Sequence, residues 1–249
     1  SLVNTNGSIS SWNTANVTNM SNMFKKATVF NQPLGNWNTS KVTDMSNMFL
    51  EAPAFNQPLN NWDVSKVENM SAMFQQATAF NQPLNNWNTE KVTNMASMFL
   101  AASAFNQPLN GWNTGEVTDM SSMFQNAKAF NNGTVMNAMG YWNVEKVTTM
   151  KNMFLNAEAF DQDLSRWKLI SVTDIDSIFK APLNKGMSCK NYSKTLQGWS
   201  LYTYTMANLN FSGQLNRQYN LVGKEARDIL TKAVAQGGKG WTISGDTYD

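Results

Sequence analysis

Tryptophan recurs along this chain at a nearly constant interval. The steps are of 25 residues, apart from one of 30 before the sixth member, in the series Trp12, Trp37, Trp62, Trp87, Trp112, Trp142 and Trp167. The residues between them repeat too: 37–61 reads WNTSKVTDMSNMFLEAPAFNQPLNN and 62–86 reads WDVSKVENMSAMFQQATAFNQPLNN. A unit this short cannot bury an apolar face alone, so tandem copies form a core by stacking. The spacing therefore predicts a solenoid of seven coils.

Apolar residues within one unit follow a helical spacing. They stand at Val42, Met45, Met48, Phe49 and Ala52, and the same positions recur in the other units. This spacing predicts a short helix, partly 3₁₀, over residues 44–52. Thr43 and Asp44 are suited to cap its start. A methionine stripe at such spacing is typical of a core rather than of a cofactor site.

The Phe55–Leu59 segment alternates apolar and polar residues, which predicts a short strand in each coil. Pro58 lacks the N–H group that a sheet needs, so the strand ends there or lies instead at Trp62–Val64. Stacked copies would pair in parallel at about 4.8 Å, with asparagine and glutamine amides bonding to their copies above and below. The predicted fold class is an α/β repeat solenoid with one short parallel strand and one short helix per coil.

Three segments are expected. Residues 1–11 form a lead-in, residues 12–183 form the solenoid, and residues 184–249 form a C-terminal cap. The end of a stack needs a cap because its last coil exposes core and strand edge. Helices are predicted at 192–199 and 223–236 and a strand at 241–243. Since the chain begins with Ser1 and the lead-in is short, we expect a longer natural protein.

Outward positions of the predicted strand are the candidate binding residues. Helices need more lateral room than strands, so the strands should line the inner side of a curved stack. The candidates are Asn31, Asn56, Asn81, Asn106, Asn131, Asp161 and Asp163. The two aspartates could together meet a cation or a sugar; solvated replacements for Asn and Pro are the favoured interpretation. The Asn or Asp after each Trp, such as Asn38 and Asp63, is expected to cap backbone between coils.

Composition excludes several classes of site. The chain has no histidine, one cysteine (Cys189), 14% charged residues and a net charge of +2. Histidine-based nucleophilic triads, zinc sites built from His and Cys, and internal disulfides are thereby excluded, and no basic patch indicates nucleic acid. No apolar run is long enough to span a membrane. We predict no enzyme activity, no cofactor and no metal, with Cys189 packed as a small buried hydrophobe.

The repeat W-N/D-x-S-x-V-T-D-M-S-x-M-F-x-x-A-x-x-F-N-Q-P-L resembles the repeats of BspA-like surface proteins, a branch of the leucine-rich repeats. The resemblance covers about residues 9–181, and the ending with Gly198-Trp199 and 240–246 is similar to the segment that often follows such repeats. Methionine stands where leucine is usual. The resemblance implies a leucine-rich-repeat-like fold and a cell-surface or secreted location.

The leading functional hypothesis is a binding or adhesion module whose partner is a surface protein or glycan of a host or neighbouring cell. The alternative is a structural stalk or spacer without its own ligand. An enzyme would have to use a carboxylate pair such as Asp161 and Asp163. Weak self-association is a further possibility, since leucine alternates with polar residues at Lys25, Leu50, Gln75, Leu100, Gln125, Leu155 and Lys180.

Overall fold

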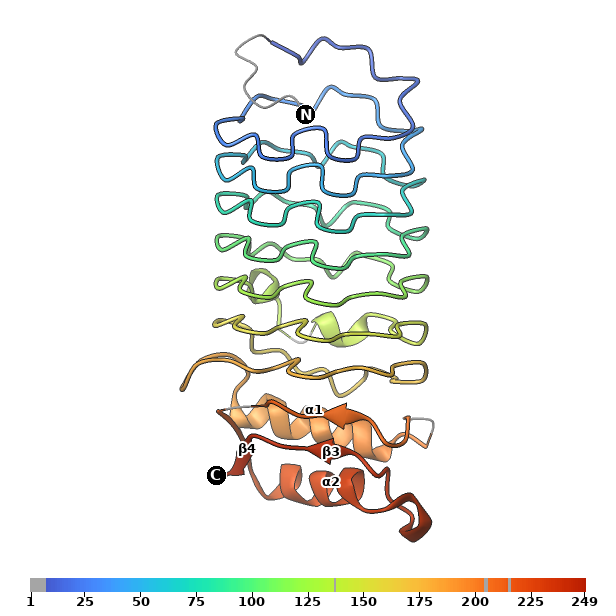
Figure 1. The fold of residues 1–249 in the computed structure, drawn as a ribbon, viewed down its shortest axis with the longest axis vertical. Coiled ribbons are helices and arrows are strands. Elements are labelled where there is room, and N and C mark those ends of the chain that lie inside the picture. Colours follow the sequence, from blue (N-terminus) through green and yellow to red (C-terminus); the bar gives the residue numbers. More distant parts are fainter. Residues whose placement is uncertain (1–7, 137, 204–205, 215) are drawn as a thin grey trace.

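The computed structural model describes residues 8–136, 138–203, 206–214 and 216–249. The chain winds into flat coils stacked along one axis, and helical layers follow at the C-terminal end (Figure 1). The regular elements are η1 (Asn132–Thr134), η2 (Ala138–Tyr141), α1 (Cys189–Leu201), β1 (Asn210–Phe211), β2 (Arg217–Tyr219), α2 (Leu221–Thr231), η3 (Val234–Gln236), β3 (Thr242–Ile243) and β4 (Asp246–Tyr248).

Aromatic and methionine side chains fill the inside of the stack. Phe49 and Phe55 stack within one coil, with ring centroids 3.9 Å apart. Each also stacks on its counterpart in the next coil, at 5.5 Å for Phe74 and 5.9 Å for Phe80. Met45 and Met48 are fully buried. The interior is therefore a set of continuous columns, and each coil covers the apolar face of its neighbour.

The predicted helix over residues 44–52 is wrong, because this segment forms a series of turns. Alternate N–H groups bond inside the coil, from Met48 to the carbonyl of Met45 and from Ala52 to that of Phe49. The N–H groups between them donate instead to the next coil, as Phe49 does to Met73. A helix would keep all of these bonds internal. Tight turns produce the same three- and four-residue apolar spacing.

The predicted strand at Phe55–Leu59 is also wrong: these residues have no regular structure. Parallel pairing lies elsewhere, as single-residue bridges that link each coil to the next, starting with Asn19 to Asp44 and Asp44 to Asn69. The residues near Pro58 bond between coils through asparagine side chains, as described below. At each bridge the backbone bonds run in both directions: the N–H of Thr43 donates to Thr18 in the preceding coil, and that of Met45 donates to Asn69 in the next. The bridge column therefore takes the role predicted for the strand.

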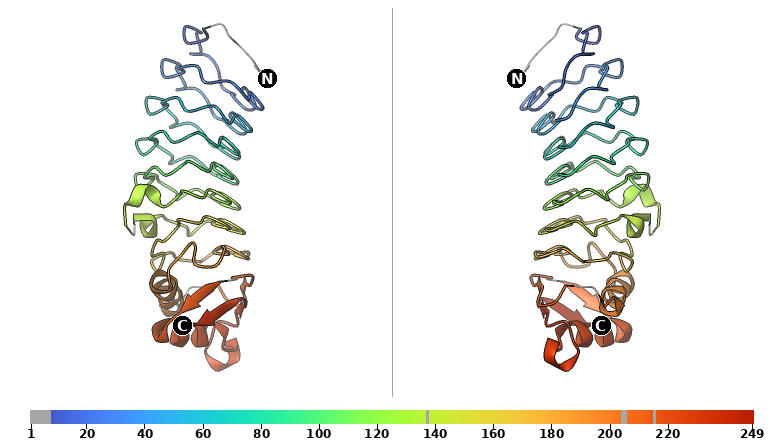
Figure 2. Two further views of the ribbon diagram at one scale, coloured as in Figure 1. Left: turned by 90° about the vertical axis from the view of Figure 1, so that its left-hand side faces the viewer. Right: turned by 90° about the vertical axis from the view of Figure 1, so that its right-hand side faces the viewer.

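Figure 2 shows that the stack bends, with η1 and η2 on the outer side. Spacing between equivalent rings explains the bend. It is 5.5 Å from Phe74 to Phe99, near the bridges, and 6.4 Å from Trp87 to Trp112. The inner side is therefore the bridge side. The expectation that residues 55–59 line the inner side is wrong. It relied on a helix in each coil to widen the opposite side, and residues 44–52 form turns instead.

From Trp37 to Trp167, the indole of each tryptophan in the series is hydrogen-bonded to the preceding turn of the chain. The indole Nε1 of Trp62 donates to the carbonyl of Leu34 at 3.0 Å, and Trp87 bonds to Leu59 at 3.0 Å. A buried indole N–H needs an acceptor, and the carbonyl of the leucine before the turn supplies it. The 25-residue interval thus carries a hydrogen bond as well as a packing contact.

The C-terminal segment continues the stack with helices on one side. Trp199 of α1 donates to the carbonyl of Leu164 at 3.2 Å, the bond that coil tryptophans make. The N–H of Ser177 donates to Ser212, beside β1. β1 pairs in parallel with β3, and β2 with β4. α1 covers the predicted helix 192–199. The single helix predicted at 223–236 is divided into α2, which begins two residues earlier, and η3.

A buried polar cluster locks β4 onto the two helices. The hydroxyl of Tyr192 donates to Asp246 at 3.0 Å, and Arg227 approaches the same carboxylate at 3.2 Å. The Asp246 side chain is fully buried. Burial is the main cause that raises the pKa of Tyr192 well above its ordinary value, and the nearby Asp246 charge raises it further.

Two residues in most coils adopt positive φ without being glycine, for example Ser97 at 57° and Ala101 at 56°. This conformation is costly for a residue with a Cβ. We expect Ala101→Gly to leave the free energy of unfolding unchanged or raise it by up to about 1 kcal/mol. Ala102 is fully buried and lies outside the positive-φ set, so Ala102→Gly, the control, should lose about 1 kcal/mol or more. Thermal unfolding measures both, and a greater loss in Ala101→Gly contradicts the turn conformation.

Stability should also fall at alkaline pH because of Tyr192. An unfolded tyrosine ionises near about pH 10, whereas the folded one keeps its proton to higher pH. The contribution of Tyr192 to the free energy of unfolding is fully present below the unfolded pKa and is lost as pH rises through the folded pKa. Urea unfolding should show a steeper alkaline decline in the wild type than in Tyr192→Phe. Tyr248→Phe, at an exposed position, should keep the wild-type slope; equal slopes in all three proteins would refute the role of Tyr192.

Candidate functional site

The predicted asparagines form one column, and their side chains hold the coils together. The Oδ1 atom of Asn56 accepts the backbone N–H of Asn81 at 2.9 Å, and that of Asn81 accepts the N–H of Asn106 at 3.0 Å. The same contact links Asn31 to Asn56 and Asn106 to Asn131. We call this column the asparagine ladder.

A second donor reaches the asparagine oxygen at each step of the ladder: a glutamine side chain at Asn31, Asn56, Asn81 and Asn131, and the Gly133 N–H at Asn106. Nε2 of Gln107 donates to both the Oδ1 atom and the carbonyl of Asn81, at 2.9 and 3.1 Å. The expected amide-to-amide ladder is therefore wrong in its pairing: backbone N–H and glutamine groups are the donors. Asn31 and Asn81 remain exposed, and Asn56, Asn106 and Asn131 are half-buried. Their oxygens are engaged within the stack.

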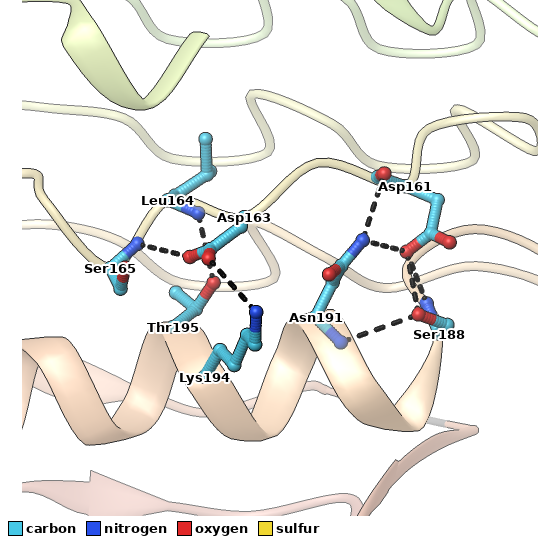
Figure 3. Close-up of polar contacts among 8 residues, drawn as sticks. All are labelled: Asp161, Asp163, Leu164, Ser165, Ser188, Asn191, Lys194 and Thr195. Atoms are coloured by element: carbon cyan, nitrogen blue, oxygen red, sulfur yellow. Dashed lines mark hydrogen bonds and ion pairs between the residues drawn. The ribbon is translucent and has the colours of Figure 1, made fainter. Parts of the chain in front are cut away.

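Asp161 ends the ladder at the junction with α1 (Figure 3). Its N–H donates to Asn131 at 3.0 Å. Its Oδ1 atom accepts the N–H and the hydroxyl of Ser188, each at 2.8 Å, and the side chain of Asn191 at 2.9 Å. Ser188 is the N-cap of α1. A carboxylate suits this position because it accepts several donors beside the positive end of a helix.

Asp163 belongs to the same coil as Asp161 and faces α1 about one turn after this junction (Figure 3). Its carboxylate accepts the N–H of Ser165 at 2.9 Å and stands 3.9 Å from the Lys194 ammonium. The neighbouring N–H of Leu164 donates to the Thr195 hydroxyl at 3.1 Å. Asp161 and Asp163 thus contact different parts of α1, and each has partners of its own.

The Asn or Asp after each Trp does not bridge coils, so that expectation is wrong. These side chains are exposed and accept an N–H two residues later in their own coil, as Asn38 does from Ser40 at 3.0 Å. This is an Asx turn, which a short side chain favours. The following threonine links the coils instead: the Thr39 hydroxyl donates to the Asp63 carbonyl at 2.9 Å.

The five-residue insertion leaves the ladder in register and bulges outward. The buried Asn132 accepts the N–H of Leu109 through its Oδ1 atom at 2.7 Å. Gly133 follows with φ of 61°, and a Cβ there would lie 2.7 Å from Pro108. The chain therefore turns away from the stack at this glycine, and η2 returns it to Trp142.

A groove lies beside the returning insertion. Three adjoining hollows of about 380, 360 and 400 Å³ share Arg166 as a lining residue. Together they run from η2, across the end of the sixth coil, to α1. α1 approaches so closely that a Cβ on Gly198 would clash with the Ser165 carbonyl. We call this surface the insertion groove, defined by Met136, Tyr141, Asp163, Arg166, Lys194 and Leu201.

Large apolar side chains are exposed in the insertion groove. Met136 is 77% exposed, Tyr141 71% and Leu201 70%. The Arg166 guanidinium lies over the Tyr141 ring, 4.3 Å from its centroid. Of the groove residues, sequence reasoning named only Asp163. The 30-residue step before Trp142 was the signal for the rest, because an insertion into a regular stack must place its residues outside the core.

The described residues hold no cluster of His, Cys, Asp and Glu that could bind a metal ion. Within the same residues, no helix is both long and apolar enough to cross a bilayer. Cys189 is half-buried rather than fully buried, at the start of α1, and burial raises the pKa of its thiol. Leu50 is buried and Leu100 and Leu155 are half-buried, which leaves the alternating leucines little apolar surface.

Asn81→Ala tests the asparagine ladder. It removes the acceptor of two donors, so we expect a loss of about 1–3 kcal/mol in the free energy of unfolding. Asn86 is exposed and has no hydrogen bond within the described ranges; its replacement by alanine is the control and should change stability by less than about 0.5 kcal/mol. Urea unfolding of both variants decides, and equal values would show that the ladder contributes nothing to stability.

Comparison with known proteins places this architecture in a family. The family model described as "Mycoplasma protein of unknown function, DUF285" matches residues 2–78, 59–136 and 134–222. The overlapping matches cover the coils and continue through α1 and β2. No curated protein matches the chain. Because the three matches span most of its length, the chain belongs to the DUF285 family of repeat proteins.

Proposed function

We propose that this chain is a binding or adhesion module of a cell-surface or secreted protein. The observation that carries the proposal is the insertion groove, where Met136, Tyr141 and Leu201 are exposed around Arg166. Tyrosine and arginine are enriched among residues that dominate binding energy in interfaces. Exposed apolar side chains gathered in one hollowed place indicate an interaction site.

The cell-surface or secreted location and the relationship to BspA-like proteins are part of the same proposal. The repeat resembles that of BspA-like surface proteins, and the partner would then be a surface protein or glycan of a host or neighbouring cell. The relationship to leucine-rich-repeat solenoids stays a prediction. The proposal includes no catalysis: the chain has no histidine, and Asp161 and Asp163 hold backbone and helix donors.

A structural spacer is the second candidate, and the asparagine ladder favours it. The predicted binding asparagines, from Asn31 to Asn131, have their side-chain oxygens engaged between coils. A stack held together at every step resists bending, as a spacer requires. Under this alternative the groove would have no partner.

Binding of the labelled chain to arrays of extracellular-matrix proteins and cell-surface glycans tests the proposal. We expect saturable binding that weakens about tenfold or more in a Met136→Ala/Tyr141→Ala variant, because truncating central interface residues typically loses that much. Val29 is 66% exposed and lies in the first coil, so Val29→Ala is the control and should bind like the wild type.

Absence of saturable binding on every array, together with an extended shape in solution scattering, would reject the binding module and favour the spacer. Binding that the double variant retains in full would move the contact away from the insertion groove.

A further inference from the structure

Arg166 is the cation of the insertion groove that lacks a carboxylate. Glu145 pairs with Lys168 at 2.8 Å, and Asp163 accepts the Ser165 N–H and lies 3.9 Å from Lys194. Arg166, by contrast, forms no ion pair within the part of the chain that the structure describes, and its contact is the Tyr141 ring. One positive charge in the groove therefore remains to be matched by a ligand.

The Tyr141 ring prepares Arg166 to receive an anion. Stacking on an aromatic face restricts the planar guanidinium to one plane, so less side-chain entropy is lost when its N–H groups are used. A guanidinium presents paired N–H donors that match the two oxygens of a carboxylate. A lysine at this position would offer a point charge without that geometry.

The apolar residues that flank Arg166 favour a peptide over a sugar as the ligand. Met136 and Leu201 offer apolar contact and no side-chain hydrogen-bond donor, and both are largely exposed. Sugar rings need polar groups to satisfy their hydroxyls, whereas a peptide can place an apolar side chain on each flank. One face of the Tyr141 ring is already covered by Arg166, which reduces its use as a stacking platform for a sugar.

We infer that the insertion groove binds an acidic segment of a partner protein, with an Asp or Glu carboxylate on Arg166 and apolar side chains against Met136 and Leu201. This inference rests on the proposed binding function and adds the chemistry of the partner. The groove crosses the end of the sixth coil between η2 and α1, so the segment would lie along the stack axis rather than around a coil.

Selection from a random-peptide display library against the intact chain tests the inference. The enriched peptides should carry Asp or Glu next to apolar residues. Their synthetic forms should bind roughly tenfold or more weakly to Arg166→Gln than to the wild type, with Arg166→Lys intermediate, because losing a charged partner typically has that effect. Replacing the acidic residue of the peptide by its amide should weaken binding to the wild type and have little further effect on Arg166→Gln.

Lys91→Gln is the matched control, since Lys91 is an exposed cation on a coil remote from the groove; it should bind the peptides like the wild type. Neutral or basic enriched peptides, or acidic ones that bind Arg166→Gln and the wild type equally, would overturn the inference. So would sulfated or sialylated glycans that bind through Arg166 when no peptide is enriched, and that result would leave the proposed binding function intact. If the wild-type chain binds no peptide and no surface ligand, both the inference and the proposed binding function are rejected.

Discussion

Backbone hydrogen bonding between coils is the constraint on which this structure depends. Along each turn segment, alternate N–H groups bond within the coil and the others donate to the next coil, as Asn47 does to Ser71 and Phe49 to Met73. Buried backbone groups must be paired, so no coil can be satisfied alone. The apolar columns add to the same dependence, because each ring is covered by its copies above and below. Stability in such a protein is a property of neighbouring coils.

The stack is directional, and α1 ends it by imitating a coil. On the side of the ladder and the tryptophans, three groups meet the contacts that a further coil would have made: Ser188 at Asp161, Thr195 at Leu164, and Trp199 at the Leu164 carbonyl. A helix can supply them because its side chains reach the coil while its own backbone bonds stay internal. β1 and β3 extend the other side of the stack in two parallel layers. The chain thereby closes its core and gives Asp161 and Leu164 of the covered coil their hydrogen-bond partners.

The regular contacts between coils and the insertion groove occupy different parts of the molecule. Side chains that repeat in every coil have structural partners: asparagines hold backbone N–H groups, tryptophans hold carbonyls, and Asx turns close the corners. Residues freed from these duties occur where the repeat is interrupted, at Met136 and Tyr141 in the insertion and at Leu201 at the end of α1. Arg166 lies between them. The interruption thus supplies two of the exposed apolar side chains of the insertion groove, Met136 and Tyr141.

The sequence by itself determined the unit, the core residues and the position of the break. Trp62, Met70, Phe74 and Leu84 could be assigned to the interior because identical units without a large apolar face elsewhere must cover one another. It also placed helices at the C-terminal end from local apolar spacing, but not where they end, since α1 runs through Gly198 to Leu201 and α2 ends at Thr231, before Gly237. The sequence could not determine the local backbone conformation, because the spacing of Met45, Met48 and Phe49 fits a helix and a series of turns equally well. Only contacts with the next coil, which lie 24 residues away, decided for turns. The role of Asn81 and the meeting of Tyr141, Arg166 and Leu201 were likewise decided by tertiary structure, because hydrogen bonds and surfaces between stacked layers depend on distances in space that no spacing along the chain encodes.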